Sequence, residues 1–151
     1  MNKNYEICPP NPDAMIESIR SLGYDLGIAV ADIIDNSISA GAKNIWISYK
    51  WLKEKTYLSI TDDGKGMTED VLFEAMRLGS MNPTLERKKE DLGRFGLGLK
   101  TASFSQCREL TVASKINQSD FVLRKWDIDV IGQDKEWKLL NKTDDYSLKL
   151  I

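Results

Sequence analysis

The sequence contains no histidine among its 151 residues. Histidine-based catalysis, zinc sites that need histidine and a phospho-accepting histidine are therefore excluded within this chain. Cysteine is scarce as well, because Cys8 and Cys107 are the only two, and two cysteines make neither a disulfide framework nor a metal cluster. A reducing compartment is the simplest setting for such a chain, so we expect a cytoplasmic protein.

Long apolar runs and an excess of one charge are also missing. No stretch approaches the ~20 apolar residues of a membrane-spanning helix, and no apolar segment follows the first residues as in a secretory signal. Charged residues make up 29% of the chain, yet the net charge is −2, so charge alone does not predict nucleic-acid binding. We expect no membrane partner, and nucleic-acid binding only through regions outside this chain.

The remaining composition, with 42% hydrophobic residues, is typical of one globular domain, which we assign to residues 1–151. Apolar periodicity and turn residues predict helices over 13–21, capped by Asp13, and over 24–40, 68–78 and 96–105. Strands are predicted over 44–51, 56–61, 109–115, 121–130 and 136–140. The first two strands are expected to pair antiparallel. This order indicates an α+β two-layer sandwich rather than a regular βαβ array.

One side of the predicted 24–40 helix is polar. At about 100° per residue, Asp25, Ala29, Asp32, Asp35, Asn36 and Ser39 share that side. The opposite side carries Leu26, Val30, Ile33, Ile34 and Ile38, which we expect to pack on the sheet. A solvated face is the ordinary interpretation of such a pattern. A binding face is favoured by the lack of lysine or arginine partners and by small residues nearby, and carboxylates beside an amide oxygen suit Mg²⁺.

An acidic residue and two glycines follow the second predicted strand. Asp62 stands at the strand end, with Gly64 and Gly66 after it, and glycine permits positive φ or a close backbone approach. Asp-Gly is also a common turn dipeptide, so an ordinary turn remains open. In the functional interpretation, Asp62 accepts a hydrogen bond from an exocyclic amine, Gly66 lets a flat base lie close, and Met67 packs on that base.

A third segment places glycines before a helix. Gly93, Gly96 and Gly98 precede Lys100, and the free N–H groups of a helix N-terminus suit phosphate. Leu99 separates Gly98 from Lys100, so the P-loop pattern is absent, and a threonine at the third glycine position rules out G-x-G-x-x-G. Glycines used only for helix–sheet packing are the alternative.

In combination, these three motifs resemble those of the GHKL ATPases. They are D-I-I-D-N at 32–36, D-D-G-K-G-M at 62–67 and G-R-F-G-L-G-L-K at 93–100. That superfamily includes gyrase B, MutL, the ninety-kilodalton heat-shock chaperones, MORC proteins and histidine kinases. The likeness spans roughly residues 13–115 and is greatest to the bacterial MORC-like and chaperone-like branch. It implies the Bergerat fold, with helices over a mixed, mostly antiparallel sheet, ATP between the helices, and a mobile lid over about 79–95.

The resemblance also implies a role for each matching residue. Asn36 would be the Mg²⁺ ligand, Asp62 would hold the adenine amino group, and Asp32 stands at the position of the general base. Ala40, Gly66 and Met67 would line the adenine pocket. Gly93, Gly96 and Gly98 would surround the phosphates with Lys100 near them, and Gly64, Phe95 and Leu97 complete the implied ATP-binding set. Arg87, Lys88 and Lys89 of the lid either approach the phosphates or form a solvated charge run.

The sequence departs from the family pattern at two places. The family's general base is glutamate, whereas Asp32 is one methylene shorter, and a misplacement of about 1 Å can cost on the order of a hundredfold in rate. In addition, no strand before Ile151 carries the family's threonine beside the adenine-binding acid, so we expect the chain to be the N-terminal fragment of a longer protein.

These features lead to one main hypothesis and three alternatives. The main hypothesis is an ATPase that uses Mg²⁺ and drives a conformational or dimerisation cycle, with an ATP-dependent homodimer in the full-length protein. A nucleotide-binding switch with little hydrolysis is the first alternative, suggested by Asp32. A protein kinase of the histidine-kinase branch is disfavoured by the missing histidine. A plain interaction domain, in which all three motifs are structural, is the last.

Overall fold

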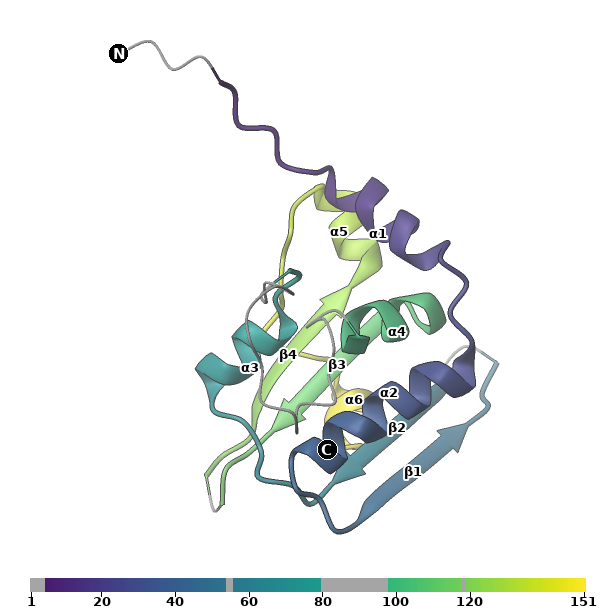
Figure 1. Cartoon of the computed structure of the whole chain (residues 1–151), viewed down its shortest axis with the longest axis vertical. Helices are drawn as coiled ribbons and strands as arrows, with labels where there is room; N and C mark the ends of the chain where they lie inside the picture. Colours follow the sequence, from purple (N-terminus) through teal and green to yellow (C-terminus); the bar gives the residue numbers. More distant parts are fainter. Residues whose placement is uncertain (1–4, 54–55, 80–97, 118) are drawn as a thin grey trace.

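The computed structural model describes residues 5–53, 56–79, 98–117 and 119–151. The elements along the chain are α1 (Pro12–Arg20), α2 (Leu26–Ser39), β1 (Ile45–Lys50), β2 (Tyr57–Asp62), α3 (Glu69–Met76), α4 (Gly98–Gln106), β3 (Glu109–Ser114), β4 (Val122–Asp127), α5 (Ile128–Asp134) and α6 (Asp145–Leu148) (Figure 1). The predicted lid, apart from Gly79, lies outside the described residues. Gly93, Phe95, Gly96, Leu97 and the lid cations also fall there.

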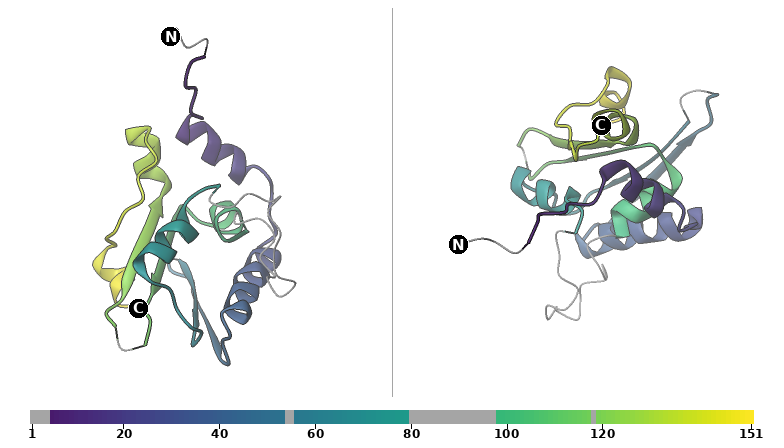
Figure 2. Two further views of the ribbon diagram at one scale, coloured as in Figure 1. Left: turned by 60° about the vertical axis from the view of Figure 1, so that its left-hand side comes forward. Right: turned by 90° about the horizontal axis from the view of Figure 1, so that it is seen from above.

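The strands form two antiparallel hairpins, β1–β2 and β3–β4. Helices α2 and α4 lie on the near side of these hairpins in Figure 1, and the C-terminal segment with α6 lies on the other side of β3–β4 in the right-hand view of Figure 2. The predicted α+β class is confirmed, as is the antiparallel pairing of the first two strands. All strand pairing among the described residues is antiparallel.

Side-chain caps fix where the helices begin. Asn11 caps α1 by accepting from the backbone N–H groups of Asp13 and Ala14, with Pro12 as the first helical residue. The prediction that Asp13 caps this helix is therefore wrong, because the cap lies two residues earlier. Asp25 caps α2 in the same way, and Thr68, the predicted start of the third helix, caps α3.

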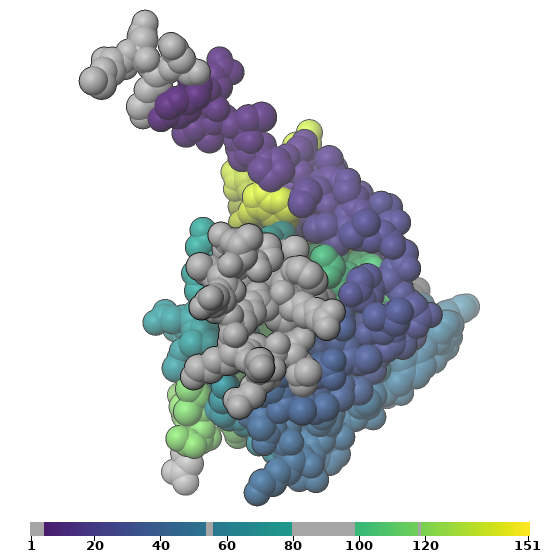
Figure 3. Space-filling model, viewed as in Figure 1, coloured from purple at the N-terminus to yellow at the C-terminus, as the bar shows by residue number. Residues whose placement is uncertain are grey.

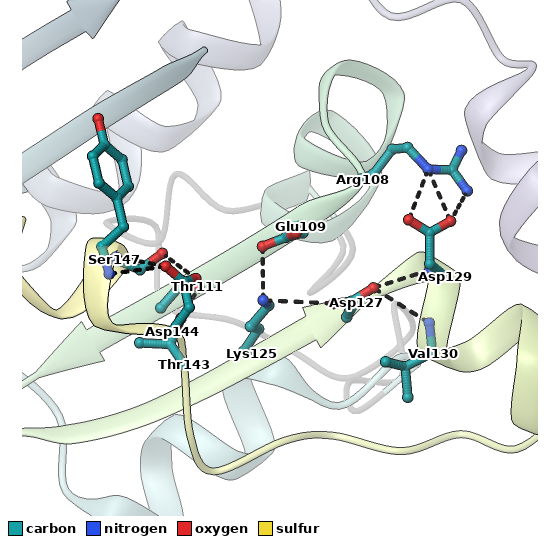
Figure 4. Close-up of polar contacts among 11 residues, drawn as sticks. Arg108, Glu109, Thr111, Lys125, Asp127, Asp129, Val130, Thr143, Asp144 and Ser147 are labelled. Atoms are coloured by element: carbon teal, nitrogen blue, oxygen red, sulfur yellow. Dashed lines mark hydrogen bonds and ion pairs between the residues drawn. The ribbon is translucent and has the colours of Figure 1, made fainter. Parts of the chain in front are cut away.

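The last predicted strands need correction. The expected 121–130 strand ends at Asp127, because its carboxylate accepts from the backbone N–H groups of Asp129 and Val130 and so starts helix α5 (Figure 4). The expected 136–140 strand is reduced to a single antiparallel bridge between Lys125 and Leu140. Helix α6, which the sequence did not predict, begins where the Asp144 side chain accepts from two backbone N–H groups, and these bonds lower the pKa of that carboxyl to about 2.

The core lies where α1, α3, α4, β4 and α5 meet. Its buried apolar cluster is formed by Ile16, Ile19, Leu72, Met76, Phe104, Trp126, Ile128 and Ile131. Trp126 is fixed within it by its indole N–H, which donates to the carbonyl oxygen of Met76 at 2.9 Å. Arg20 extends this contact region by donating to the carbonyl oxygens of Phe104 and Cys107 at the end of α4, at 2.7 and 2.8 Å. The α4 helix is thereby attached to α1 by an apolar contact and by hydrogen bonds.

Two further observations complete the description of the fold. Among the helices that the structure describes, none combines the length and apolar character needed to cross a bilayer. Burial raises the pKa of the Cys107 thiol to about 11, so this cysteine is a neutral thiol at physiological pH.

Candidate functional site

A hydrogen bond joins helix α2 to the end of strand β2. The Ser37 hydroxyl donates to Oδ2 of Asp62 at 2.9 Å, while Oδ1 of Asp62 accepts from the backbone N–H of Gly64 at 2.9 Å. Ser37 is only 4% exposed and faces inward. Sequence reasoning missed it, although a serine in line with apolar positions of the helix was a visible signal. The carboxylate of Asp62 is thus oriented by its own loop and by α2.

The loop after β2 is fastened to its surroundings at several points. Lys65 donates its backbone N–H to the carbonyl oxygen of Ala40, the residue that caps the C-terminus of α2, at 3.0 Å. The Asp63 carboxylate accepts from the backbone N–H groups of Asn44 and Lys43, at 2.9 and 2.7 Å. These bonds, together with one from the Asn44 side chain, lower the pKa of Asp63. The Asp63 carboxylate is therefore used to hold the loop in place, and Asp62 is the neighbouring acid that is the candidate for binding a ligand.

At each glycine of this loop, a neighbouring protein atom leaves no room for a Cβ. Gly66 has φ +67°, and a Cβ there would lie 1.8 Å from the carbonyl oxygen of Lys115. A Cβ on Gly64 would lie 2.8 Å from the Cβ of Ala40. The structure thus gives a reason for Gly66 within the protein itself, the close approach of the Lys115 backbone, and the expected approach of a flat base stays a prediction. The next residue, Met67, donates its backbone N–H to the buried hydroxyl of Ser114.

The polar side of α2 is only partly as predicted. Asp35, Asn36 and Ser39 are exposed and Asp32 is half-buried, which agrees with an accessible polar side. Ala29 does not belong to it, because it is 3% exposed. Leu26 and Ile38, expected to pack on the sheet, are 51% and 52% exposed. The buried residues of the helix are instead Ala29 and Ser37, two turns apart. Helix α2 packs against α4 (Figures 1 and 3).

Asp32 is held by a residue from the segment before α2. The phenol of Tyr24 donates to Oδ2 of Asp32 at 3.0 Å, across eight positions of sequence. The carboxylate of Asp32, through this hydrogen bond, raises the pKa of Tyr24, so the phenol remains a donor at neutral pH. Asp32 therefore presents one oxygen to Tyr24 and keeps the other for a second donor.

The Lys100 side chain is buried against the end of α3. It is 1% exposed, and its ammonium donates to the carbonyl oxygens of Ala75 and Arg77 at 2.7 and 2.9 Å. It satisfies orphan carbonyls at the end of α3, as cations at helix C-termini do. Burial lowers the pKa of Lys100 to about 8. The ammonium of Lys100 is thus already hydrogen-bonded to the end of α3, and the expectation that it lies near the phosphates stays a prediction.

A known family accounts for this arrangement of α2, the β2 loop and α4. The family model for histidine kinase-, DNA gyrase B- and HSP90-like ATPases matches residues 24–149. The chain belongs to this family. The GHKL assignment made from the three motifs is therefore confirmed.

Relatives of this GHKL domain come from several branches. The protein named ATPase morc-1 of Caenorhabditis elegans is 30% identical over 87 residues, which cover 58% of this chain and 10% of the relative. The DNA mismatch repair protein MutL of Dictyoglomus turgidum is 32% identical over 111 residues, which cover 72% of this chain and 19% of the relative. The chaperone protein HtpG of Bacillus velezensis is 27% identical over 135 residues, which cover 76% of this chain and 21% of the relative. The chain thus spans no more than about a fifth of these relatives' length.

The donors present on α2 suit the Mg²⁺ that the sequence predicts. Within the described residues, no group of three or more histidine, cysteine, aspartate or glutamate side chains could hold an ion by itself. Asn36 offers an exposed amide oxygen on the same side of α2 as Asp35. Mg²⁺ takes few ligands from protein and the rest from phosphates and water, so a single amide oxygen fits this ion better than a closed protein cage would.

Replacing Gly66 by alanine tests the close approach between the β2 loop and Lys115. We expect Gly66→Ala to lower the free energy of unfolding by about 3 kcal/mol or more, because the left-handed φ and the backbone contact both oppose a Cβ. Gly41→Ala is the matched control, since Gly41 has φ +77° with no atom near its Cβ position, and it should cost only about 1 kcal/mol. Urea unfolding of both variants measures this, and equal losses would contradict the contact.

The buried ammonium of Lys100 predicts a pH dependence of stability in this GHKL domain. Unfolding returns its pKa from about 8 to 10.5, so the unfolded chain holds more protons between these values. The free energy of unfolding should therefore rise with pH across that window, by up to about 3 kcal/mol from this residue.

Lys100→Met should remove this rise, while Lys142→Met, at an exposed position, should leave it in place. Urea unfolding of the three proteins at pH values on either side of about 8 gives the comparison. An identical pH dependence in Lys100→Met and the wild-type protein would show that the ammonium is not buried.

Proposed function

We propose that this GHKL domain binds ATP with Mg²⁺ and hydrolyses it. The observation that carries the proposal is the placement of two motifs at one junction: Ser37 of α2 holds Asp62 of β2, while Asp32 and Asn36 project from the same helix. Family membership supports the nucleotide class. Asp62 on β2, the acid proposed for the adenine base, is thus joined by one hydrogen bond to α2, which carries the side chains proposed for the phosphate end.

For nucleotide binding, Asp62 has the acceptor capacity that an exocyclic amine needs. Its two oxygens each accept one hydrogen bond, from Ser37 and from Gly64, and an ionised carboxylate offers about four acceptor positions. The small residues Ala40 and Gly64 lie beside it. Because the loop is already ordered by hydrogen bonds, little conformational entropy is lost when it accepts a ligand.

For hydrolysis, Asp32 is the proposed general base and Asn36 the protein ligand of Mg²⁺. When bound, Mg²⁺ neutralises charge on the phosphate oxygens as the γ-phosphoryl group is transferred. Asp32 accepts a proton from the water that attacks the γ-phosphorus, and the bond to the β-phosphate oxygen breaks, giving ADP and phosphate. Turnover in the whole protein would time a conformational or dimerisation cycle.

A nucleotide-binding switch without useful turnover is the second candidate. The observation that favours it is Asp32 itself, whose carboxylate is one methylene shorter than that of the family's glutamate and is already bound to Tyr24. Such a domain would change its partner contacts on ATP binding alone. A kinase of the histidine-kinase branch is disfavoured, because the chain contains no histidine.

Separate measurements of binding and turnover distinguish these candidates. Calorimetry with ATP and Mg²⁺ should show binding by the wild-type domain and at least about tenfold weaker binding by Asp62→Asn, since a charge-assisted hydrogen bond is lost. Asp32→Asn should bind as the wild type does but hydrolyse at least about a hundredfold more slowly.

Asp35→Asn, which removes a neighbouring exposed carboxylate from the same helix, is the matched control and should keep wild-type turnover. If wild-type turnover equals that of Asp32→Asn while both bind ATP, the domain is a switch. If neither binds ATP or ADP, the motifs are structural and the domain acts by protein interaction.

A further inference from the structure

The hydroxyl of Tyr24 is the described group that contacts the candidate base directly. It donates to Oδ2 of Asp32 at 3.0 Å, and both side chains are half-buried. We propose that Tyr24 is a positioning residue for ATP hydrolysis, which holds the Asp32 carboxylate so that its second oxygen faces the attacking water. This inference rests on the proposed function and deepens it, because it names what makes a short base usable.

The direction of the Asp32 side chain explains how so distant a residue reaches it. Side chains of a helix lean toward its N-terminus, so the Asp32 carboxylate is directed back along α2 toward the segment that precedes the helix. Tyr24 stands in that segment, two residues before the first helical residue. A phenol is long enough to meet the carboxylate there.

The backbone of Tyr24 is fixed from both sides. Its carbonyl oxygen accepts a hydrogen bond from the side-chain amide of Gln106, the last residue of α4. The following residue, Asp25, accepts from the backbone N–H groups of Gly27 and Ile28 and so fixes the start of α2. The hydroxyl therefore projects from an ordered turn that both α2 and α4 hold, and it is suited to orient another side chain.

For Asp32 as the general base, the orientation of its carboxylate matters more than its distance from the attacking water alone. An aspartate on the accessible side of a helix can occupy several rotamers, and only one of them directs an oxygen to a given water. A donor bound to Oδ2 selects one rotamer and leaves Oδ1 available. Removing the donor should therefore lower the fraction of enzyme with a usable base and leave nucleotide contacts unchanged.

Tyr24→Phe keeps the ring and removes the hydroxyl, so it tests the proposal directly. We expect kcat for ATP to fall about tenfold while KM and the calorimetric Kd for ATP stay at wild-type values, a split that a loss of folding would not produce. Tyr49→Phe, on the exposed side of β1, is the matched control and should leave both parameters unchanged. Urea unfolding of each variant verifies that the assays contain folded protein.

A double-mutant cycle decides whether the hydroxyl acts through Asp32. In an Asp32→Ala background, Tyr24→Phe should cause no further loss of turnover. An equal loss in both backgrounds would overturn the proposal, because it would indicate a general structural effect. Wild-type kcat in Tyr24→Phe would also overturn it while leaving the proposed function intact, provided that Asp32→Ala is impaired. If the wild-type domain binds ATP without turnover, the hydrolytic function fails first and the positioning role fails with it.

Discussion

The hydrogen bond from Ser37 to Asp62 is the contact on which the candidate site depends. It spans 25 positions of sequence and joins the helix that carries Asp32 and Asn36 to the strand that ends at Asp62. Because Ser37 is buried, water does not compete for its hydroxyl, and the bond is stronger than the same bond on the surface would be. In the proposed function, this hydrogen bond between α2 and β2 would set the spacing between the groups that bind the two ends of the nucleotide.

Several motif residues support this geometry without belonging to the face that a ligand would meet. Asp63 accepts the backbone N–H groups that precede β1, Gly66 allows the carbonyl of Lys115 to approach, and Lys100 binds the end of α3. We expect substitutions at these positions to disturb folding first. In the proposed function the chemistry rests on Asp32, Asn36 and Asp62, and a motif match alone does not separate these two groups of residues.

Local signals predicted much of this structure from the sequence. The α+β class, the β1–β2 pair and the bounds of α2 and α3 to within two residues followed from periodicity, turn residues and caps such as Thr68. Errors arose where two local signals competed: Ile128 and Val130 favour strand by β-branching, yet the Asp127 side chain began a helix there. The local sequence does not decide between strand and helix at this position, because the choice depends on the contact between α5 and the core.

The side of α2 that faces inward was a different kind of error. A helical wheel groups residues by direction, but it does not say which directions neighbouring elements cover, and Ala29 is buried although the wheel places it on the polar side. Likewise, a lysine after a glycine-rich segment resembles a phosphate ligand, and only the position of α3 shows that its ammonium is used elsewhere. Contacts distant in sequence decided both cases.

In the proposed mechanism, the shorter general base and the tyrosine beside it would have opposite effects on catalysis. An aspartate in place of glutamate would withdraw the carboxylate from the attacking water and so lower the rate. It also removes one rotatable bond, so less side-chain entropy is lost when the carboxylate is fixed, and the Tyr24 hydroxyl then fixes it with a single hydrogen bond. The pair is therefore better understood as one unit, in which the length of the acid matches the reach of the tyrosine.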